Sequence, residues 1–214
     1  MPIAGDISFG AKKRYFKIIC LKGIEKNFIL KIFSPKTSNG VNMEEKVILV
    51  NKKNEPIGVE GKMKAHYDGK LHRAFSVVLF NKKGETLLQK RAESKYHSPG
   101  LWTNTCCSHP RPKERVGVAA KRRLKEEMGI SCPLEEVFSF IYKVKLGRLF
   151  EHEFDHVFFG MFDGKPKPNK KEVSDWQWIK LNDLKNDIAK NPKKYTPWFK
   201  TIIKKIAKEK NKKK

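Results

Sequence analysis

The 214-residue sequence lacks any apolar run that approaches the ~20 residues needed to cross a bilayer. Its N-terminus also lacks the apolar stretch and small-residue cleavage site of a secretory signal. The four cysteines show no Cys-x-x-Cys spacing, so a disulfide framework is not indicated. These absences exclude the membrane-spanning and the secreted, disulfide-rich classes. They predict a cytoplasmic protein without a membrane partner.

Acidic residues are also few, with 23 Asp and Glu against 47 Lys and Arg and a net charge of +24. A surplus this large attracts anions, which include nucleic acid, anionic lipid and phosphorylated metabolites. Lysine-rich tails and loops that are simply solvated would give the same count, so charge alone does not choose among these partners. No RRM or KH signature is present, and we expect no nucleic-acid partner.

The chain divides into three parts by composition. Residues 1–42 mix basic residues with short apolar patches and read as an appended segment: a flexible arm, a targeting peptide, or an extension upstream of a true start at Met43. Residues 43–203 carry the patterns of a folded domain. The lysine-rich tail, 204–214, is expected to be disordered.

The folded part has mixed patterns and predicts an α/β (α+β) domain. Val116, Ala120, Leu124 and Met128 form one apolar stripe of a helix over 115–128, which Gly129 ends. A last helix starts at Thr196-Pro197. The predicted strands are 47–50, 74–80, 85–90, 136–145, 154–162 and 174–179, with the second and third joined as a hairpin through the turn at 81–84.

Three histidines and two glutamates form a candidate metal-ligand set: His66, His72, His109, Glu151 and Glu153. A single histidine is more often a satisfied polar residue than a ligand, and two alternating glutamates more often lie on a solvated strand face. Five imidazole and carboxylate ligands together suit Zn²⁺, Mn²⁺ or Fe²⁺ better than Ca²⁺. They build an octahedral site more easily than a tetrahedral one.

The predicted helix carries a second pattern, which resembles the Nudix box. That box runs Gly, five residues, Glu, seven residues, then Arg-Glu-aliphatic-x-Glu-Glu-x-Gly-aliphatic. The matching positions are Glu114, Arg122, Leu124, Glu126, Glu127, Gly129 and Ile130. Ser108 replaces the opening Gly, and Arg123 replaces the Glu after the Arg. Nudix hydrolases use these carboxylates to hold Mg²⁺ against a diphosphate, so the loss of one disfavours hydrolysis.

The degenerate box resembles that of the type I isopentenyl-diphosphate isomerases, a family with the Nudix fold. The stretch 102–110 (WTNTCCSHP) is similar to their cysteine motif, Glu151-x-Glu153 to their glutamate motif, and 196–199 (TPWF) to their tryptophan motif. His66 with His72 resembles their histidine pair, and 91–95 resembles their substrate-binding loop. The resemblance covers about residues 43–200 and implies a mixed β-sheet sandwiched between helices.

The resemblance implies the activity and the individual roles. The reaction is the isomerisation of isopentenyl diphosphate to dimethylallyl diphosphate. Separately from the resemblance, we expect a monomer. The proton-transfer pair would be Cys107 and Glu153, with Tyr142 assisting Glu153 and Trp198 beside the cation. The first metal, Mn²⁺, Zn²⁺ or Mg²⁺, would be bound by His66, His72, His109, Glu151 and Glu153. A second ion, Mg²⁺, would bridge Glu127 and the diphosphate, which Lys62, Arg91, Lys95 and Arg123 would contact.

The chemistry fits these residue types. An unactivated alkene is a weak base and its protonation gives a tertiary carbocation, so the site must supply an acid, exclude water and stabilise positive charge. We favour Glu153 on the protonation side and Cys107 as the base, although the sequence does not fix that direction. Arg123 suits an isomerase, because a guanidinium binds phosphate oxygens where a hydrolase needs a carboxylate.

Two rival readings compete with the isomerase. A Nudix pyrophosphohydrolase acting on a nucleotide would leave Cys107 and Trp198 without a role. A structural zinc protein would use Cys106, Cys107 and His109, but adjacent cysteines rarely fit one tetrahedral site.

Overall fold

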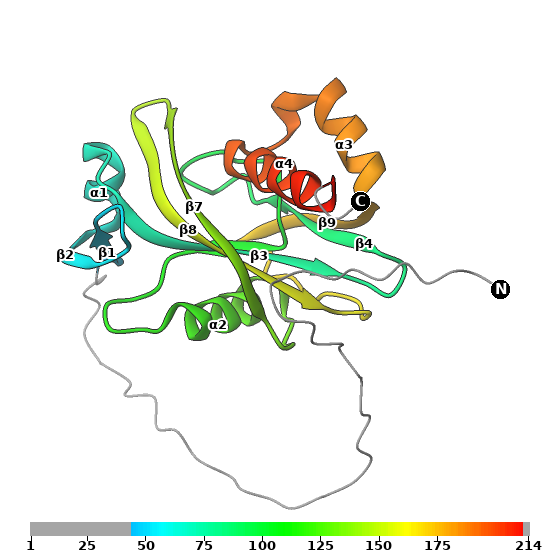
Figure 1. The fold of residues 1–214 in the computed structure, drawn as a ribbon, viewed down its shortest axis with the longest axis horizontal. Coiled ribbons are helices and arrows are strands. Elements are labelled where there is room, and N and C mark those ends of the chain that lie inside the picture. Colours follow the sequence, from blue (N-terminus) through cyan, green and yellow to red (C-terminus); the bar gives the residue numbers. More distant parts are fainter. Residues whose placement is uncertain (1–43, 212–214) are drawn as a thin grey trace, which may run out of the picture. The chain divides into compact units, whose positions relative to one another are not determined.

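The computed structural model describes residues 44–211, and the strands in this part of the chain form one nine-stranded sheet (Figure 1). The segment 1–42, predicted to be an appendage, lies outside the described residues. The same holds for the last three lysines.

Strand β3 (His72–Phe80) is the axis of the sheet. One of its edges pairs in parallel with β8 (Leu149–Met161) over its whole length. The other edge is shared in succession by β1 (Lys46–Val50), β6 (Cys106–Ser108) and β4 (Glu85–Arg91). Three separate segments of the chain therefore pair with successive parts of the same edge of β3.

The remaining strands extend the sheet on both sides. Strand β2 (Pro56–Gly61) pairs with β1, and β7 (Glu135–Leu146) forms a long antiparallel hairpin with β8. Strands β5 (Trp102–Thr103) and β9 (Val173–Lys180) both pair with β4.

The predicted strands are present, with two corrections. The hairpin expected over 74–90 has only the pair Phe80↔Thr86, because β6 takes the edge of β3 and β9 takes the edge of β4. The strand expected at 154–162 begins at Leu149, so it also contains Glu151 and Glu153, whose strand alternation was predicted but whose side chains are buried rather than solvated.

Helices cover the sheet on both sides, as predicted (Figure 1). Helix α2 (Val116–Met128) lies on one side and contacts β3, β6 and β8. Helix α3 (Leu181–Lys190), a 3₁₀ turn (Pro192–Lys194) and α4 (Pro197–Asn211) lie on the other.

The predicted stripe of α2 builds the core beneath β3. Ala120, Leu124 and Met128 are fully buried with Phe75 and other side chains of the sheet. Burial of each large apolar side chain contributes roughly 1.5–3 kcal/mol. Gly129 ends the helix with φ of 67°, a backbone conformation that favours glycine.

The last helix is longer than expected. It continues to Asn211 rather than fading into a disordered tail near residue 203, and Ile206 is 1% exposed, so packing continues past that boundary. Helices α1 (Lys62–Asp68) and α3 were not predicted. Helix α1 spans only seven residues, whereas α3 carries an apolar stripe, Leu181, Leu184 and Ile188, which was an available signal. Among residues 44–211, no helix is long and apolar enough to cross a membrane.

Candidate active site

Helix α1 and its end bring the first two histidines together. His66 lies in the last turn, and Gly69 ends the helix in the left-handed conformation with φ of 63°. The chain then reverses into β3, whose first residue is His72. The ring centroids of His66 and His72 are 4.7 Å apart, and both side chains are fully buried.

The sheet adds the other predicted ligands. The parallel register places Glu153 opposite His72, and strand alternation puts Glu151 on the same face as Glu153. His109 follows β6, which lies on the other edge of β3. We call these five residues, His66, His72, His109, Glu151 and Glu153, the His/Glu cluster.

Backbone carbonyls fix the tautomers of two histidines. His66 Nδ1 donates to the carbonyl of Lys62 at 2.7 Å, and His72 Nδ1 donates to that of Lys70 at 2.8 Å. In a neutral imidazole the other nitrogen then carries a lone pair. This is the arrangement found in metal-bound histidines, where the second ring nitrogen is held by an outer hydrogen bond.

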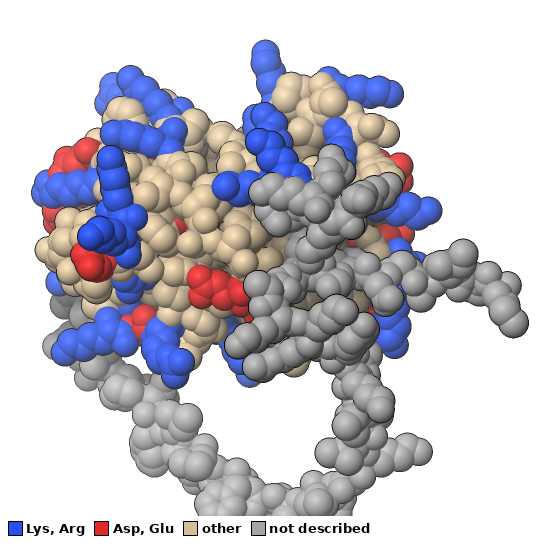
Figure 2. Space-filling model, in the orientation of Figure 1, with Lys and Arg blue, Asp and Glu red and all other residues tan. Residues whose placement is uncertain are grey.

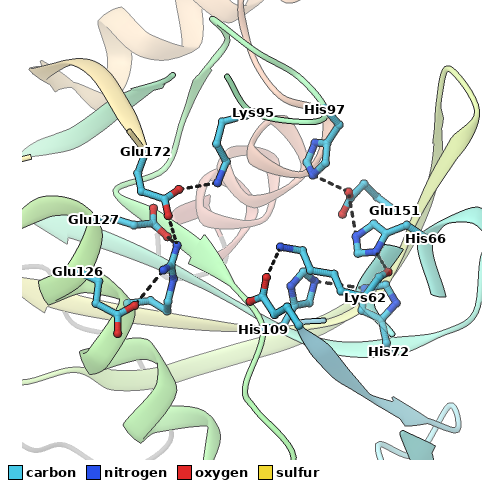
Figure 3. A network of polar contacts seen from close by, with 12 residues as sticks. Lys62, His66, His72, Lys95, His97, His109, Glu126, Glu127, Glu151 and Glu172 are labelled. Carbon is cyan, nitrogen blue, oxygen red and sulfur yellow. Dashed lines mark hydrogen bonds and ion pairs between the residues drawn. The ribbon is translucent and has the colours of Figure 1, made fainter. Parts of the chain in front are cut away.

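The donor atoms of the cluster converge on one region, and Figure 3 shows four of the five residues, His66, His72, His109 and Glu151. His72 Nε2 lies 3.2 Å from His109 Nε2, which lies 2.8 Å from Glu153 Oε1. His66 Nε2 lies 3.4 Å from Glu151 Oε1, and within the described residues neither atom has a hydrogen-bond partner. Buried imidazole nitrogens and carboxylate oxygens that lie this close to one another fit a divalent cation.

One cavity of about 440 Å³, including its open mouth, contains all four predicted catalytic residues, Cys107, Tyr142, Glu153 and Trp198. Tyr142 is opposite Glu153 in the β7–β8 register and donates from its hydroxyl to Glu153 Oε2 at 2.6 Å. Trp198, at the start of α4, is 3% exposed. The Arg91 guanidinium carbon lies 5.6 Å from its ring centroid, so this ring already has a cation beside it.

Burial sets the protonation of the two proton-transfer candidates. It raises the pKa of the Cys107 thiol to about 12, although the positive charge of Arg91 acts in the opposite direction. Burial also opposes ionisation of Glu153, but its contacts with His109 and His72 hold the pKa of its carboxyl below the ordinary value. In the site without substrate, Cys107 is therefore a thiol and Glu153 a carboxylate.

The four predicted diphosphate-binding residues, Lys62, Arg91, Lys95 and Arg123, line the same cavity, and we call them the cationic rim. Carboxylates neutralise three of them (Figure 3). Lys62 pairs with Glu45 at 2.8 Å, and Glu172 pairs with both Lys95 at 2.6 Å and Arg123 at 3.0 Å. The Arg91 guanidinium instead donates to two loop carbonyls.

Similarity to known proteins decides the family. The NUDIX domain model matches residues 70–199. The chain is 53% identical over 165 residues to isopentenyl-diphosphate Delta-isomerase 1 of Aromatoleum aromaticum, a match that covers 77% of this chain and 93% of that protein. It is 54% identical over 162 residues to isopentenyl-diphosphate Delta-isomerase 2 of Photorhabdus laumondii, covering 75% and 92% of the two chains.

The chain belongs to the isopentenyl-diphosphate Delta-isomerase family.

Solved structures agree with the Nudix fold of this family. A Deinococcus radiodurans crystal structure aligns with a TM-score of 0.65 at 18% identity, covering 76% of this chain and 99% of that chain. A MutT protein from Methanosarcina mazei aligns with a TM-score of 0.55 at 19% identity, covering 65% and 95%. Identities this low support the fold alone.

The Nudix box of this isomerase-family chain is largely engaged in ion pairs. Glu114 accepts two hydrogen bonds from the Arg122 guanidinium, each 2.8 Å long, and the half-exposed Glu126 pairs with Arg122 and Arg123. Glu127 and Arg123 form an i, i+4 pair, which would usually lie on a solvent-exposed helix face, but Glu127 is buried. Its oxygens accept from Arg123 at 2.8 Å and from Gln89 at 3.0 Å.

Sequence reasoning missed three residues of the site. His97, whose Nε2 lies 3.0 Å from Glu151 Oε1, and Glu172 on the cationic rim had no motif of their own. Asp155 continues the alternation of Glu151 and Glu153, a signal that was available. It accepts a hydrogen bond from Ser76 at 2.9 Å, and its burial near Glu153 raises the pKa of its carboxyl well above the ordinary value.

Proposed function

We propose that this chain isomerises isopentenyl diphosphate to dimethylallyl diphosphate, with Cys107 and Glu153 as its proton-transfer pair. The observation that carries the proposal is a single cavity in which both residues lie next to four cationic side chains. Relatives that are more than half identical over three quarters of this chain bear the name of that isomerase.

The diphosphate is bound first, by the cationic rim. Its oxygens replace the carboxylates of Glu45 and Glu172 as partners of Lys62, Lys95 and Arg123, and a guanidinium binds phosphate oxygens bidentately. Mg²⁺ would accompany the diphosphate, with Glu127 as its protein ligand. Glu127 then gives up one of its present partners, Arg123 or Gln89.

The hydrocarbon end of the substrate occupies the inner cavity. A proton is added at the terminal alkene carbon, which leaves a tertiary carbocation, and a proton is removed from the adjoining methylene group. We assign protonation to Glu153 with Tyr142, which are joined by a hydrogen bond of 2.6 Å, and deprotonation to Cys107. This direction requires a protonated Glu153 and a Cys107 thiolate, the reverse of their forms in the site without substrate, so a proton must move from the thiol to the carboxylate before turnover. The indole of Trp198 stabilises the cation, by about 2 kcal/mol in a desolvated site.

The residues of the His/Glu cluster would hold a divalent cation, Mn²⁺, Zn²⁺ or Mg²⁺, which would orient and acidify Glu153. The chain itself restricts Glu153 further, because Tyr142 and His109 contact its two different oxygens. Proton transfer by Cys107 as a base requires the thiolate. Arg91 is the cation in the cavity that favours this form, since its charge acts to lower the thiol pKa.

Hydrolysis of a diphosphate is the runner-up. It is disfavoured because Arg123 replaces a box glutamate and Arg122 occupies both oxygens of Glu114. A nucleic-acid partner also gains no support from the surface. In Figure 2 the Lys and Arg side chains are spread over the visible face among acidic ones rather than gathered in one stripe. The monomeric state and cytoplasmic location stay predictions.

The test uses the purified full chain with isotopically labelled isopentenyl diphosphate and Mg²⁺. We expect acid-labile allylic product from the wild type and none from Cys107→Ala. Cys132→Ala is the matched control, because it removes a partly buried thiol outside the cavity and should retain activity. A folded, metal-loaded wild type that yields no allylic product would refute the proposal. Release of phosphate from nucleoside diphosphates would then favour the hydrolase.

A further inference from the structure

The loop between β4 and β5, residues 92–101, carries much of the cationic rim. Lys95 lies on the loop itself. Arg91, at the end of β4, is held by it, because its guanidinium donates to the carbonyls of His97 at 3.0 Å and Ser98 at 3.2 Å. The position of this loop therefore sets the position of two diphosphate contacts.

The His97 side chain leaves the loop and enters the His/Glu cluster (Figure 3). It is 8% exposed, and its Nε2 lies 3.0 Å from Glu151 Oε1. Its ring is stacked on that of His66, with centroids 6.2 Å apart and an interplanar angle of 25°. The loop thus supplies an imidazole to a group of side chains that otherwise comes from α1, the sheet and the segment after β6.

The contact between His97 and Glu151 is close but is not a hydrogen bond. Glu151 Oε1 is buried and has no hydrogen-bond partner among residues 44–211, although two imidazole Nε2 atoms lie within 3.4 Å of it. In the neutral form of His66 the proton lies on Nδ1, which donates to a carbonyl, so Nε2 carries a lone pair. The donor atoms of His66, His97 and Glu151 lie within 4.8 Å of one another, which suits a shared cation.

The backbone beside His97 is also unusual. Ser98 has φ of 47°, in the left-handed region that non-glycine residues rarely adopt, and Gly100 follows with φ of 68°. A non-glycine residue in this conformation costs of the order of 1 kcal/mol. Such strain concentrates at sites where the chain must present a particular side chain. Here the two turns direct His97 inward.

We propose that His97 is a further metal ligand, which supplies the sixth donor to the ion of the His/Glu cluster and fastens the diphosphate-binding loop to it. Two groups of donors overlap at His66: its donors lie within 4.8 Å of those of His72, His109 and Glu153 in one group, and of His97 and Glu151 in the other. Five donors leave one position of an octahedron, and His97 Nε2, 3.0 Å from Glu151 Oε1, is the nitrogen that would fill it. Four imidazoles and two carboxylates favour Zn²⁺, Mn²⁺ or Fe²⁺ over Mg²⁺. The inference rests on the same site as the proposed function.

The first measurement needs no variant. In the full chain with ¹⁵N-labelled histidine, Zn²⁺ should shift the ring Nε2 resonances of four of the six histidines. The two expected to remain unshifted are His152 and His156, which face the other side of β8. A shift of only the three histidines of the cluster would overturn the proposal.

The second measurement tests the link to the loop. His97→Leu should weaken Zn²⁺ binding to the metal-free protein at least tenfold, as measured by calorimetry. Zn²⁺ should slow hydrogen exchange over residues 92–101 in the wild type and should not do so in His97→Leu. His156→Leu is the matched control and should behave as the wild type in both, because its ring binds Asn54 and Glu136 away from the cluster.

Unchanged Zn²⁺ affinity in His97→Leu, or loop protection that persists in it, would contradict the proposal. Neither measurement involves turnover. A protein that binds Zn²⁺ through His97 but forms no allylic product would refute the isomerase function and leave this inference standing.

Discussion

Three residues of the His/Glu cluster, His109, Glu151 and Glu153, line the same cavity as the cationic rim, yet the cluster and the rim are built in opposite ways. In the cluster, lone pairs of like character face one another in a buried region, and backbone carbonyls hold two imidazoles in that orientation. In the rim, three of four cations are already neutralised by carboxylates. We therefore expect the cluster to gain stability when a cation binds. In the rim, by contrast, the diphosphate would replace carboxylates that already pair with its cations.

The strongest test of this difference removes a cluster residue that also transfers a proton. Glu153→Gln keeps the shape of the side chain but removes its charge and its proton-transfer capacity. We expect kcat to fall roughly 10³-fold or more, since positioned acid–base groups contribute about 10²–10⁴. Glu135→Gln, an exposed position on β7, is the control and should keep wild-type activity. Comparable kcat values for the two variants would remove Glu153 from the mechanism.

Acid should destabilise the metal-free protein through the cluster. Burial lowers the pKa of His109 from 6.5 to about 4, although Glu153 acts in the opposite direction. Between these values the unfolded chain binds a proton that the folded chain does not, so stability decreases as the pH falls from 6.5 to 4, by about 3 kcal/mol for this group. Denaturant unfolding across this range should show a shallower pH dependence for His109→Asn. Equal slopes would argue against the depressed pKa.

Metal should stabilise the cluster and not the rim. At a free concentration 100 times its Kd, a cation that binds only the folded chain adds about 2.7 kcal/mol. In a domain of this size that raises Tm by roughly 5–10 °C. The shift should vanish in His72→Leu, which removes a ligand, and persist in Lys95→Met, which removes a rim cation. Thermal unfolding of each protein with and without Zn²⁺ measures it, and a shift retained in His72→Leu would place the ion elsewhere.

The smallest effect is expected at the rim. Lys62→Met should raise KM for the diphosphate substrate roughly tenfold, because one hydrogen bond to a charged group contributes about 1.5–3 kcal/mol. Its effect on kcat should be smaller. Lys64→Met is the matched control on the same helix, since Lys64 is exposed and pairs with Asp68 outside the cavity. Steady-state kinetics would contradict the rim assignment if both variants had the same KM.

The sequence was most informative where function and local pattern coincide. The fold class and the family could be predicted from local patterns. These patterns are the apolar stripe of α2, its end at Gly129, and the motifs around Cys107 and Glu153. The contacts of α1 and the packing of Ile206 could not be predicted in this way, because both depend on tertiary neighbours rather than on a periodic pattern.

Two of the three missed site residues were missed for a different reason. His97 and Glu172 lie in connecting segments, outside the strands and helices. A histidine in a loop carries no signal about what it faces. Glu172 joins the rim only because residues 167–169 return along the end of α2, where Lys167 and Asn169 donate to the carbonyls of Met128 and Glu127. The path of this segment depends on the tertiary structure, so no local sequence pattern predicts it.

The parallel pairing of β3 with β8 also has a consequence for the order of events in folding. It joins residues such as Ser76 and Asp155, which are 79 positions apart, and contacts of such long range form only after a large entropic cost of loop closure. A nascent chain in which β8 has not yet been synthesised holds all three histidines of the His/Glu cluster but neither glutamate. If the cluster is the metal site proposed above, metal binding therefore requires that synthesis has passed Glu153, and Trp198 is added to the cavity later still.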